Sequence, residues 1–406
     1  MSTIVLKFGG TSVATTELIK SAAHIVKKEY ESGHNLAVVV SAMAGTTNSL
    51  INYVNEINSG TDSEYDVVVS SGEQITSGLM SLALNQIGIP ARSWLGWQLP
   101  IITSGPHRNS VIEKIFPDKI LEGFKEKQVA VLAGFQGLSM NDRITTIGRG
   151  GSDNTAVFLA SALNADRCDI YTDVDGVYTS DPKITPNVKK LNKVSYEEMI
   201  EMSSQGAKVL QTASVESAMN KNVNVHVRST FIPDEKGTEI SLDNDNEVLR
   251  VVTGVAYSKD EAKITIIDLV DKPGIAAKVF RALSDDSINV DMIVQNNFIE
   301  RKMTNLTFTV PMGDLEKSLS ILETLKSQIA FSRIISEDNL SKVSIIGSGM
   351  RNRPGIAAKM FKCLSEQNIN IEVISTSEIK VSVLIDRLRT EDAVNSLHDA
   401  FKLDDI

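Results

Sequence analysis

The chain has 406 residues and a formal net charge of −10, and 42% of its residues are hydrophobic, 23% charged and 5% aromatic. This composition is typical of an α/β protein of two or three domains and argues against a basic nucleic-acid-binding surface. No apolar run approaches the roughly 20 residues of a membrane-spanning helix, so we expect neither nucleic acid nor a membrane as a partner. The two cysteines, Cys168 and Cys363, match no metal-binding spacing, which indicates reduced thiols in a cytoplasmic protein.

Residues 3–8 form an apolar run that predicts a strand. At its end Lys7 and the pair Gly9-Gly10 precede a helix predicted over 16–30. A strand, a glycine turn and a helix start point backbone N–H groups at an anion, and Lys7 adds a positive charge there. The alternative is a plain glycine turn in which the Lys7 side chain extends into water. Taken alone, the stretch is consistent with both, and the segments that follow favour phosphate binding.

Three further apolar runs predict strands that end in small or hydroxyl-rich turns, at residues 36–40, 67–69 and 129–132. Together with the first strand they predict a mostly parallel sheet whose carboxyl edge carries one ligand crevice. Glu73 begins a helix predicted over about 74–86. Its carboxylate either stabilises the helix dipole or faces the crevice as a ligand.

The segment 148–153 (GRGGSD) places Arg149 between glycines, and Ser152 and Asp153 open a helix predicted to about residue 163. Glycines allow a ligand to approach the backbone closely, and the planar guanidinium suits a carboxylate or a phosphate. Asp153 could be only a helix cap, the usual role of such a residue. An arginine held between glycines favours a binding site over a plain turn.

Residues 168–172 predict another strand, followed by the segment 173–183 (DVDGVYTSDPK). Its carboxylates, tyrosine and lysine suit a nucleotide site, although a polar surface loop fits equally well. Lys208 precedes a helix predicted over 212–220, and it is either a second phosphate-binding lysine or a solvated residue. The polar stretch 233–246 is typical of a domain boundary or of a loop beside one.

The C-terminal part contains an internal repeat, since residues 271–293 match 352–374 at an offset of 81 with 12 of 23 positions identical. Each copy predicts a strand, a Pro-Gly turn, a helix, two strands and a second helix. The Pro-Gly turn leaves amides free at the helix start, which suits a small anion. Residues 331–335 add a sixth segment to the first copy, whereas the second copy has no strand after its last helix. We therefore expect the strand predicted over 249–256 to complete the second unit, so that one module lies inside the other.

Over essentially its whole length the chain resembles the aspartate kinases, in an ordered set of motifs: KFGGTSV at 7–13, SAMAGTTN at 41–48, GE at 72–73, GRGGSD at 148–153, TDVDGVYTSDP at 172–182, and the duplicated PGIAAK. The resemblance implies an α/β fold, with an amino acid kinase (carbamate kinase-like) α/β/α sandwich at 1–245 and two intertwined ferredoxin-like βαββαβ ACT domains. ACT domain 1 is expected at 263–337, and a discontinuous ACT domain 2 at 246–258 plus 341–406. The implied reaction is the phosphorylation of L-aspartate on its side-chain carboxylate, with ATP and Mg²⁺, at the start of lysine, threonine and methionine biosynthesis.

The resemblance also implies roles for individual residues. Those implied to be catalytic are Lys7 and Asp153. Those implied to bind aspartate are Ser41, Thr47, Glu73, Arg149 and Ser152. Those implied to bind the nucleotide are Lys7, Phe8, Gly9, Gly10, Thr172, Asp173, Tyr178, Asp181, Lys183 and Lys208. No residue is implied to bind a metal directly.

The ACT pair implies feedback inhibition by lysine, threonine or both. The implied effector-binding residues are Asp271, Gly274, Ala276, Asn289, Asp291 and Gln295 in one module, and Ile356, Ala357, Asn370, Ile371, Ser377 and Glu378 in the other. The alternative for the second module is a purely structural role. We also expect a homo-oligomer through the ACT domains, and a regulatory subunit made from an internal start, known in related enzymes, is a further candidate partner.

Two positions depart from the family pattern. Lys183 stands where arginine is frequent, which keeps the charge but loses the planar fork, and Gln211-Thr212 stand where His-Pro is common. The nearest alternative is another enzyme of the amino acid kinase fold, acting on glutamate, an N-acetylated amino acid or a nucleotide. The alternative of a different class is a non-catalytic amino-acid sensor, and the intact set of implied site residues argues against it.

Overall fold

The computed structural model describes residues 2–57, 60–148, 150–205, 209–242, 250–298, 303–351 and 353–405. The chain divides into two compact units. The first comprises the described residues of Met1–Val177, Lys190–Ser204 and Lys208–Asn246, and the second those of Tyr178–Lys189, Gln205–Ala207 and Glu247–Ile406. The second unit therefore includes one segment, Tyr178–Lys189, that lies far upstream of the rest in sequence.

An eight-stranded sheet forms the centre of the first unit, in the order β12-β14-β13-β9-β1-β2-β6-β3. Its strands are β1 (Thr3–Phe8), β2 (Asn35–Val40), β3 (Ala91–Trp94), β6 (Val129–Ala133), β9 (Arg167–Thr172), β12 (Lys193–Ser195), β13 (Val225–Ser229) and β14 (Thr238–Ser241). Every neighbouring pair is parallel except β13 and β14. The mostly parallel sheet predicted from the sequence is therefore present.

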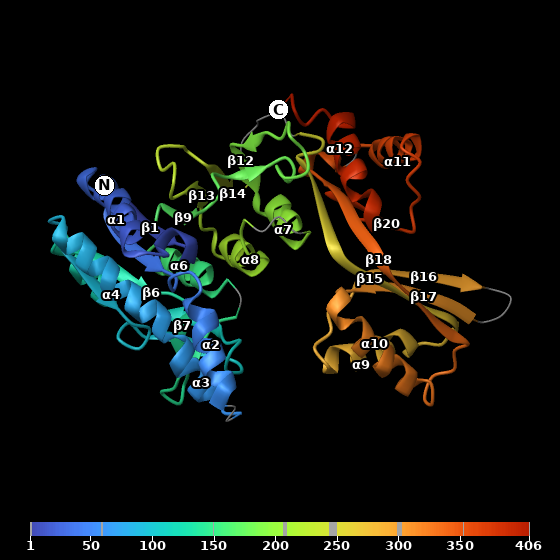
Figure 1. The fold of residues 1–406 in the computed structure, drawn as a ribbon, viewed down its shortest axis with the longest axis horizontal. Coiled ribbons are helices and arrows are strands. Elements are labelled where there is room, and N and C mark those ends of the chain that lie inside the picture. The colour runs from blue at the N-terminus through green and yellow to red at the C-terminus, as the bar shows by residue number, and fades with distance from the viewer. Residues whose placement is uncertain are drawn as a thin grey trace. The chain divides into compact units, whose positions relative to one another are not determined.

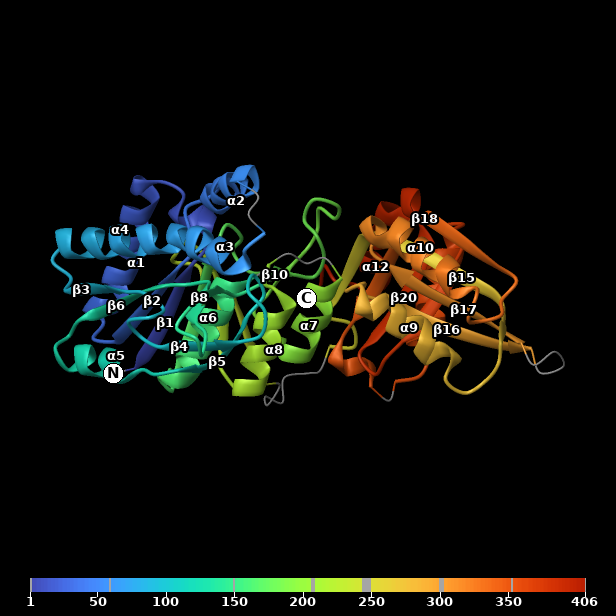
Figure 2. The ribbon, with the colours of Figure 1, turned by 90° about the horizontal axis from the view of Figure 1, so that it is seen from below.

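Helices cover both faces of this sheet (Figures 1 and 2). The helices described in the first unit are α1 (Thr16–Glu31), α2 (Thr46–Ile57), α3 (Asp62–Val69), α4 (Ser71–Gln86), α5 (Asp118–Lys125), α6 (Gly151–Ala162), α7 (Tyr196–Ser204) and α8 (Thr212–Lys221). A second, four-stranded sheet has the order β5-β4-β7-β8. Its strands are β4 (Ile101–Ser104), β5 (Val111–Ile115), β7 (Gln136–Leu138) and β8 (Ile144–Thr146), and a two-stranded ribbon is formed by β10 (Val177–Tyr178) and β11 (Lys190–Leu191).

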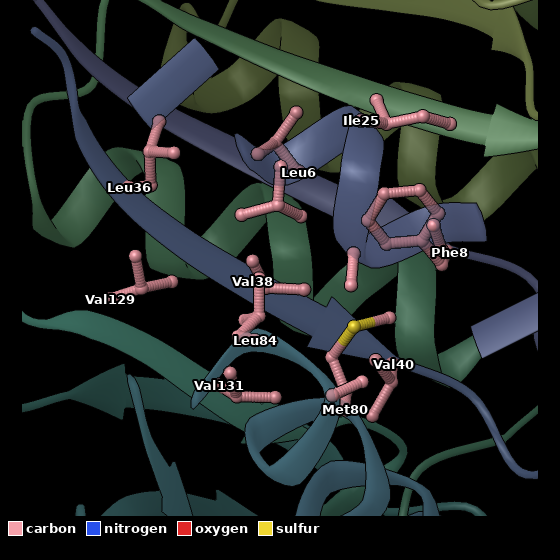
Figure 3. Packing of buried hydrophobic residues seen from close by; sticks show 14 of the residues in the cluster. Leu6, Phe8, Ile25, Leu36, Val38, Val40, Met80, Leu84, Val129 and Val131 are labelled. Atoms are coloured by element: carbon pink, nitrogen blue, oxygen red, sulfur yellow. The ribbon is translucent and has the colours of Figure 1, made fainter. Parts of the chain in front are cut away.

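Successive side chains of β1 point to opposite faces of the sheet, as in any extended strand. Leu6 and Phe8 pack with α1 and α4 in a buried core that also contains Met80 and Leu84 (Figure 3). Lys7 lies between Leu6 and Phe8 in sequence, so its side chain points to the opposite face, where α6 packs against β1. The alternation of one short strand thus directs a lysine toward α6.

The connection from β1 to α1 differs from a simple glycine turn. A short 3₁₀ helix, Gly10–Val13, comes first, and α1 begins only at Thr16. The side chain of Thr15 caps α1 by accepting a hydrogen bond from the backbone of its first turn. One backbone N–H of the first turn of α1 is therefore already paired with the Thr15 side chain.

The carboxyl ends of the central strands lie at one edge of the sheet. Phe8 of β1 is in register with Val40 of β2 and with Tyr171 of β9, and Val40 is in register with Ala133 of β6. The turns that follow β1, β2 and β6 therefore meet at the same edge, as the sequence predicted.

The strand predicted at residues 67–69 is wrong, because these residues form the last turn of α3. Three consecutive valines favour a strand only weakly, whereas Asp62 and Glu64 in the first turn stabilise a helix N-terminus. Glu73 consequently reaches the carboxyl edge from the N-terminal turn of α4, which follows α3 almost directly.

The polar stretch 233–246, predicted as a boundary or loop, contains a strand of the main sheet. Strand β14 pairs antiparallel with β13 after a turn at Gly237, whose φ is 72°. A Cβ at Gly237 would lie 1.9 Å from the backbone oxygen of Val227, so only glycine fits there. The turn-forming residues around it predicted a loop, and the four-residue strand β14 was therefore not recognised in the sequence.

The second unit is built on a six-stranded sheet in the order β16-β17-β15-β18-β20-β19. Its elements are β15 (Gly254–Val270), α9 (Ile275–Asp285), β16 (Asp291–Phe298), β17 (Met303–Val310), α10 (Leu315–Leu325), β18 (Arg333–Ile346), α11 (Ile356–Glu366), β19 (Val373–Thr376), β20 (Lys380–Asp386) and α12 (Thr390–Ala400). Short 3₁₀ helices span Met312–Asp314, Ser348–Met350 and Arg387–Arg389.

Two long strands are shared between the halves of this unit. Residues 254–258 of β15 pair with 342–346 of β18, which in turn pairs with β20. The later part of β15 pairs with β17 and with residues 333–337 of β18. The first βαββαβ half is therefore continuous in sequence, whereas the second is completed by residues 254–258, which precede the first half. This is the intertwined fold that the resemblance implied.

The internal repeat is also visible in local geometry. Gly274 and Gly355, the glycines of the two Pro-Gly turns, have φ values of 89° and 93° and are the N-caps of α9 and α11. This left-handed conformation favours glycine, which explains why both copies carry it at the same offset. The duplication seen in the amino-acid sequence is therefore also present in the backbone conformation.

Charged pairs join the two halves in a reciprocal way. Asp291 and Glu372 are 81 residues apart, the offset of the repeat, and each pairs with a lysine from the other half. Lys342 Nζ lies 2.7 Å from Asp291 Oδ2, and Lys263 Nζ lies 3.1 Å from Glu372 Oε2. Burial opposes the ionisation of Asp291, but Lys342 outweighs it and lowers the pKa of this carboxyl.

The segment Tyr178–Lys189 is held by side chains of the second unit. Thr179 Oγ1 lies 3.0 Å from Nε2 of His398 in α12, and both side chains are buried. The hydroxyl of Tyr257 in β15 donates a hydrogen bond of 2.9 Å to Asp181. The conformation of this segment therefore depends on the C-terminal half of the chain.

A buried ion cluster in the first unit supports a stability prediction. Asp169, fully buried in β9, accepts hydrogen bonds from Arg167 Nε on both oxygens at 3.0–3.1 Å and lies 3.5 Å from Arg228 Nη1. Burial raises the pKa of Asp169, because desolvation outweighs the nearby arginines.

We expect Asp169→Ala to lower the free energy of unfolding of the first unit by about 3 kcal/mol, since it leaves two arginines without their buried partner. The matched control is Asp234→Ala, which removes the exposed ion pair with Lys28 and should leave the free energy of unfolding nearly unchanged. Urea unfolding of both variants measures the difference. Equal losses in the two variants would contradict the prediction.

Candidate active site

A pocket of about 280 Å³ opens at the carboxyl edge of the main sheet, where the turns after β1, β2 and β6 meet the N-terminal turns of α4 and α6. The lining residues that the sequence singled out are Lys7, Gly10, Ser41, Thr47, Glu73, Ser152 and Asp153. The other lining residues are Ala42, Met43, Ala44, Gly45, Phe135, Gly150 and Gly151. Side chains from distant parts of the sequence thus converge on one cavity.

Lys7 and Asp153 form an ion pair inside this pocket. Lys7 Nζ lies 2.6 Å from Asp153 Oδ1, and each residue is only 8% exposed. Lys7 comes from the end of β1 and Asp153 from the first turn of α6. The pair fixes the ammonium group at the pocket wall, where it can neutralise negative charge on a ligand.

Two glycines allow the turns around the pocket to pack closely. A Cβ at Gly10 would lie 2.9 Å from the backbone oxygen of Ala42, so β1 can approach the turn after β2 only with glycine there. Gly150 is the N-cap of α6 with a φ of 73°, and a Cβ there would lie 2.4 Å from Gln211. Gln211, which departs from the family pattern, therefore packs directly against the turn that carries Ser152 and Asp153.

Glu73 is a buried carboxylate that faces the pocket. It is 3% exposed, and its Oε1 accepts a hydrogen bond of 3.0 Å from the backbone N–H of Ala42. Its Oε2 is buried and has no hydrogen-bond partner among the described residues. Burial raises the pKa of Glu73 to about 7, which the Ala42 N–H only partly offsets. A buried carboxylate in this state is suited to receive a cationic group of a ligand.

The sequence-based nucleotide set is only partly brought together. Lys7 and Gly10 line the pocket, whereas the Phe8 side chain is buried and stacks on Tyr171 with ring centroids 5.0 Å apart. The N–H of Gly9 donates to the backbone oxygen of Tyr171 at 3.0 Å. The Phe8 side chain is therefore part of the packing around the sheet, and the Gly9 N–H is already hydrogen-bonded. Neither group is free to bind a ligand.

The remaining nucleotide candidates lie elsewhere. The hydroxyl of Thr172 donates to the exposed Asp173 at 3.1 Å in the first unit. Tyr178, Asp181 and Lys183 belong to the second unit, where Asp181 accepts a hydrogen bond of 2.9 Å from the Lys183 backbone in addition to that from Tyr257. Arg149 of the aspartate set and Lys208 of the nucleotide set lie outside the described residues.

Several of the candidate effector residues already have partners in the second unit. These pairs are Asp291 with Lys342 at 2.7 Å, Asn370 with Glu372 at 2.9 Å, and Glu378 with Arg351 at 3.2 Å. Asp271, Gly274 and Asn289 are exposed near the start of α9 and before β16. An effector at either module would therefore meet ion pairs as well as free surface.

Sequence reasoning missed two contributors to the pocket. Ala42 holds Glu73 through its backbone N–H, and a backbone donor leaves no signature in residue type. Phe135 lines the pocket after β6, and its backbone N–H donates to Thr155 in α6 at 3.2 Å. The small-residue turns after β2 and β6 were the only signal that could have indicated these positions.

No group of three or more His, Cys, Asp or Glu side chains in the described part of the chain is arranged to hold a metal ion. None of its helices has the length and apolar character that crossing a membrane requires.

The parallel sheet, the pocket at its carboxyl edge and the Lys7–Asp153 pair define a kinase of the amino acid kinase family. Residues 2–229 match the model of the amino acid kinase family, and residues 264–325 and 343–401 match that of the ACT domain. An aspartate kinase of Pseudomonas putida is 47% identical over 406 residues, which cover 100% of this chain and 98% of that protein. The chain therefore belongs to the aspartate kinase family.

Solved structures agree with this assignment. Escherichia coli aspartokinase III in complex with aspartate and ADP (R-state) has a TM-score of 0.81 at 26% identity, covering 98% of this chain and 99% of that chain. The same enzyme in complex with lysine and aspartate (T-state) has a TM-score of 0.78 at 26% identity. The reaction of the family is ATP-dependent phosphorylation of the side-chain carboxylate of L-aspartate, the first step toward lysine, threonine and methionine. It is feedback-regulated through the ACT domains.

Proposed function

We propose that the pocket of Lys7, Glu73 and Asp153 is where L-aspartate accepts the γ-phosphoryl group of ATP. Glu73 pairs with the substrate ammonium, and Arg149 clamps its α-carboxylate, while Ser41, Thr47 and Ser152 supply hydroxyl groups around it. The observation that carries the proposal is the buried, partly unpaired Glu73 carboxylate in the same cavity as the Lys7 ammonium. L-aspartate has one ammonium group and two carboxylates, so it can be bound by a cavity that contains both a carboxylate and a cationic side chain.

The chemistry needs alignment and charge neutralisation more than proton transfer. The nucleophile is the side-chain carboxylate of the substrate, which with a pKa of about 3.9 is ionised at neutral pH. Lys7 stabilises the negative charge of the transferring phosphoryl group, and Asp153 holds Lys7 in position through the 2.6 Å contact. Asp153 has no proton to accept in this scheme and acts as an orienting residue.

Magnesium fits this site as part of the nucleotide complex. Mg²⁺ usually binds one or two carboxylates together with phosphate oxygens and water, and Asp153 is the pocket carboxylate able to contribute. When bound, the ion supplies further neutralisation of phosphate charge.

Lysine, threonine or both are proposed as effectors of the ACT domains, and the ACT domains as the surface through which copies of the chain associate. Inhibition requires an effector that binds the inactive arrangement more tightly than the active one. An effector ammonium near Asp291 would share this carboxylate with Lys342, so binding should change the ion pairs that join the two halves. Isothermal titration with each amino acid tests this, and no heat with either would remove the proposal.

The assay that tests the activity is ATP- and Mg²⁺-dependent ADP release with L-aspartate, compared with L-glutamate. Turnover with aspartate alone, followed by inhibition with lysine, threonine or both, is expected. Turnover with glutamate would change the assigned substrate. No turnover with any amino acid would favour a sensor that has lost catalysis.

The role of the segment around Asp181 gives a further prediction. The Tyr257 hydroxyl, whose pKa burial and Asp181 raise to about 12, is protonated at neutral pH and donates to Asp181. If this segment binds the nucleotide, Tyr257→Phe should raise the KM for ATP about fivefold and leave the KM for aspartate unchanged. Tyr30→Phe, which removes a 3.0 Å hydrogen bond to the Lys127 backbone, is the control. An unchanged KM for ATP in Tyr257→Phe would argue against a nucleotide contact of this segment.

A further inference from the structure

The first turn of α4 contains a buried glycine, Gly72, at a position where the backbone does not require one. Gly72 lies inside the helix and does not have the positive φ that favours glycine elsewhere in the chain. Glycine destabilises a helix relative to alanine. The absence of a side chain at this position therefore needs another reason.

The space around Gly72 supplies that reason. A Cβ at this position would lie 2.8 Å from the Cβ of Ala42, 3.4 Å from Thr46 Cγ2 and 3.6 Å from Leu50 Cδ1. The last two distances are ordinary contacts, whereas 2.8 Å is shorter than two carbon atoms can tolerate. Because the Cβ of Ala42 is attached directly to the backbone, it cannot rotate away. A side chain at residue 72 would therefore push α4 and the turn after β2 apart.

Both sides of this contact are anchored to strands. The turn after β2 is joined to β1 by the Ser41 N–H, which donates to the Phe8 carbonyl at 3.1 Å. The residue before α4 is joined to β7 by the buried Gln136 side chain, whose Nε2 donates to the Ser70 carbonyl at 3.2 Å. The strain of an added side chain would therefore fall on the junction between Ala42 and the first turn of α4.

The hydrogen bond that holds Glu73 crosses the same junction. Glu73 follows Gly72 directly, and its Oε1 accepts the 3.0 Å hydrogen bond from the Ala42 N–H. Its Oε2 is buried and has no hydrogen-bond partner among the described residues. One oxygen is thus held by Ala42 while the other is left for a ligand. Separation of Ala42 from α4 would release the oxygen that is held.

We propose that Gly72 is a positioning residue for aspartate recognition. Its lack of a side chain lets α4 lie against Ala42, and this contact keeps the Glu73 carboxylate on the Ala42 N–H at the wall of the pocket. The inference rests on the ammonium-binding role proposed above for Glu73. Gly72 is not a lining residue of the pocket and acts on the substrate only through Ala42 and Glu73.

Steady-state kinetics of the full-length enzyme test this role. Gly72→Ala is expected to raise the KM for aspartate about tenfold, while the KM for ATP stays within about twofold. The Ala42 N–H favours the ionised carboxylate, so its loss should also shift the acid-side fall of kcat/KM for aspartate to higher pH, by about one pH unit. Gly78→Ala is the matched control, because Gly78 lies in the same helix and a Cβ there would meet nothing within 4 Å. It should leave both KM values and the pH dependence unchanged.

A second substitution tests the contact itself. Ala42→Gly removes the atom that a side chain at residue 72 would meet, and it keeps the N–H that holds Glu73. The double variant of Gly72→Ala with Ala42→Gly should therefore have a KM for aspartate within about threefold of that of Ala42→Gly alone. A helix that is only destabilised by the substitution would not be rescued in this way. Thermal unfolding of all the variants, measured in parallel, shows which of them are folded.

The proposal is overturned if folded Gly72→Ala keeps the wild-type KM for aspartate, if the two KM values rise together, or if Ala42→Gly does not rescue the variant. If Gly72→Ala does not fold, the double variant decides: folding with the KM of Ala42→Gly supports the proposal, and any other result overturns it. Absence of aspartate-dependent turnover in the wild-type enzyme, or an unchanged kcat/KM in Glu73→Gln, would instead reject the proposed function, so the two failures are distinguishable.

Discussion

Replacing Lys7 with alanine is expected to lower kcat about 10²- to 10³-fold, the usual cost of removing one group that stabilises transition-state charge. The KM for aspartate should change by no more than about threefold, because Lys7 acts on charge that grows during transfer and not on the bound amino acid. The ammonium is well placed for this role, since it is buried, held by Asp153, and at the end of a strand in the rigid sheet. Initial rates of ADP release over a range of aspartate concentrations measure both constants.

Loss of Lys7 also leaves Asp153 buried without its cation, so stability has to be measured in parallel. Lys7→Met keeps much of the side-chain volume, and Lys20→Ala on the exposed surface of α1 is the control for removal of a lysine. A folded Lys7→Met enzyme with a wild-type kcat would remove Lys7 from the mechanism. A loss confined to the KM for aspartate would assign Lys7 to amino acid binding instead.

Glu73 should make aspartate recognition depend on pH near neutrality. Its pKa in the free protein is about 7, raised by burial, so below that pH the carboxyl becomes neutral and loses its attraction for the substrate ammonium. The value of kcat/KM for aspartate should therefore fall about tenfold per unit as the pH decreases below 7. The same ratio for ATP at saturating aspartate should show no such limb, and it is the internal control.

Glu73→Gln should lower kcat/KM for aspartate at pH 8 by at least about 30-fold, corresponding to the 2 kcal/mol or more that a truncated buried charge pair costs. Because the pKa of Glu73 is raised on folding, ionised Glu73 destabilises the free protein. This cost is absent below the ordinary pKa of 4.5 and grows to at most about 3 kcal/mol as the pH rises through 7. The glutamine variant should therefore be at least as stable as the wild type at pH 8 without aspartate. A variant that is less stable and retains its activity would contradict both parts.

The pocket residues were predictable because short-range patterns place them. Lys7 lies near the end of the apolar run that predicts β1, and glycine turns after β1 and before α6 mark the carboxyl edge. Glu73 was predicted to follow a strand at residues 67–69. It lies in the pocket, but the valines before it belong to helix α3. The acidic residues Asp62 and Glu64 in the first turn of α3 favour the helix over the strand that the valines suggest.

Features that depend on long-range contacts were not predictable. The four strands of the smaller sheet have three to five residues each, too few for a periodic signal. Asp66 reads in the sequence as one polar residue, and only the structure shows that it is buried beside Thr146 and His107. The repeat, in contrast, predicted that an upstream strand completes the second module, because counting strands in each copy requires no knowledge of packing.

The position of Tyr178–Lys189 has a consequence for how this protein can be rearranged by recombination or by design. If the regions after residue 245 were replaced by those of another protein, Tyr257 and His398 would be lost. These are the residues that hold Asp181 and Thr179. Such a chimera would keep residues 178–189, the candidate nucleotide-binding segment, together with the rest of the kinase domain. It would lack the two side chains that hold this segment in its conformation. We expect an exchange to succeed when residues 178–189 are replaced together with the ACT modules. The unit to be exchanged is therefore encoded by two separate stretches of the gene.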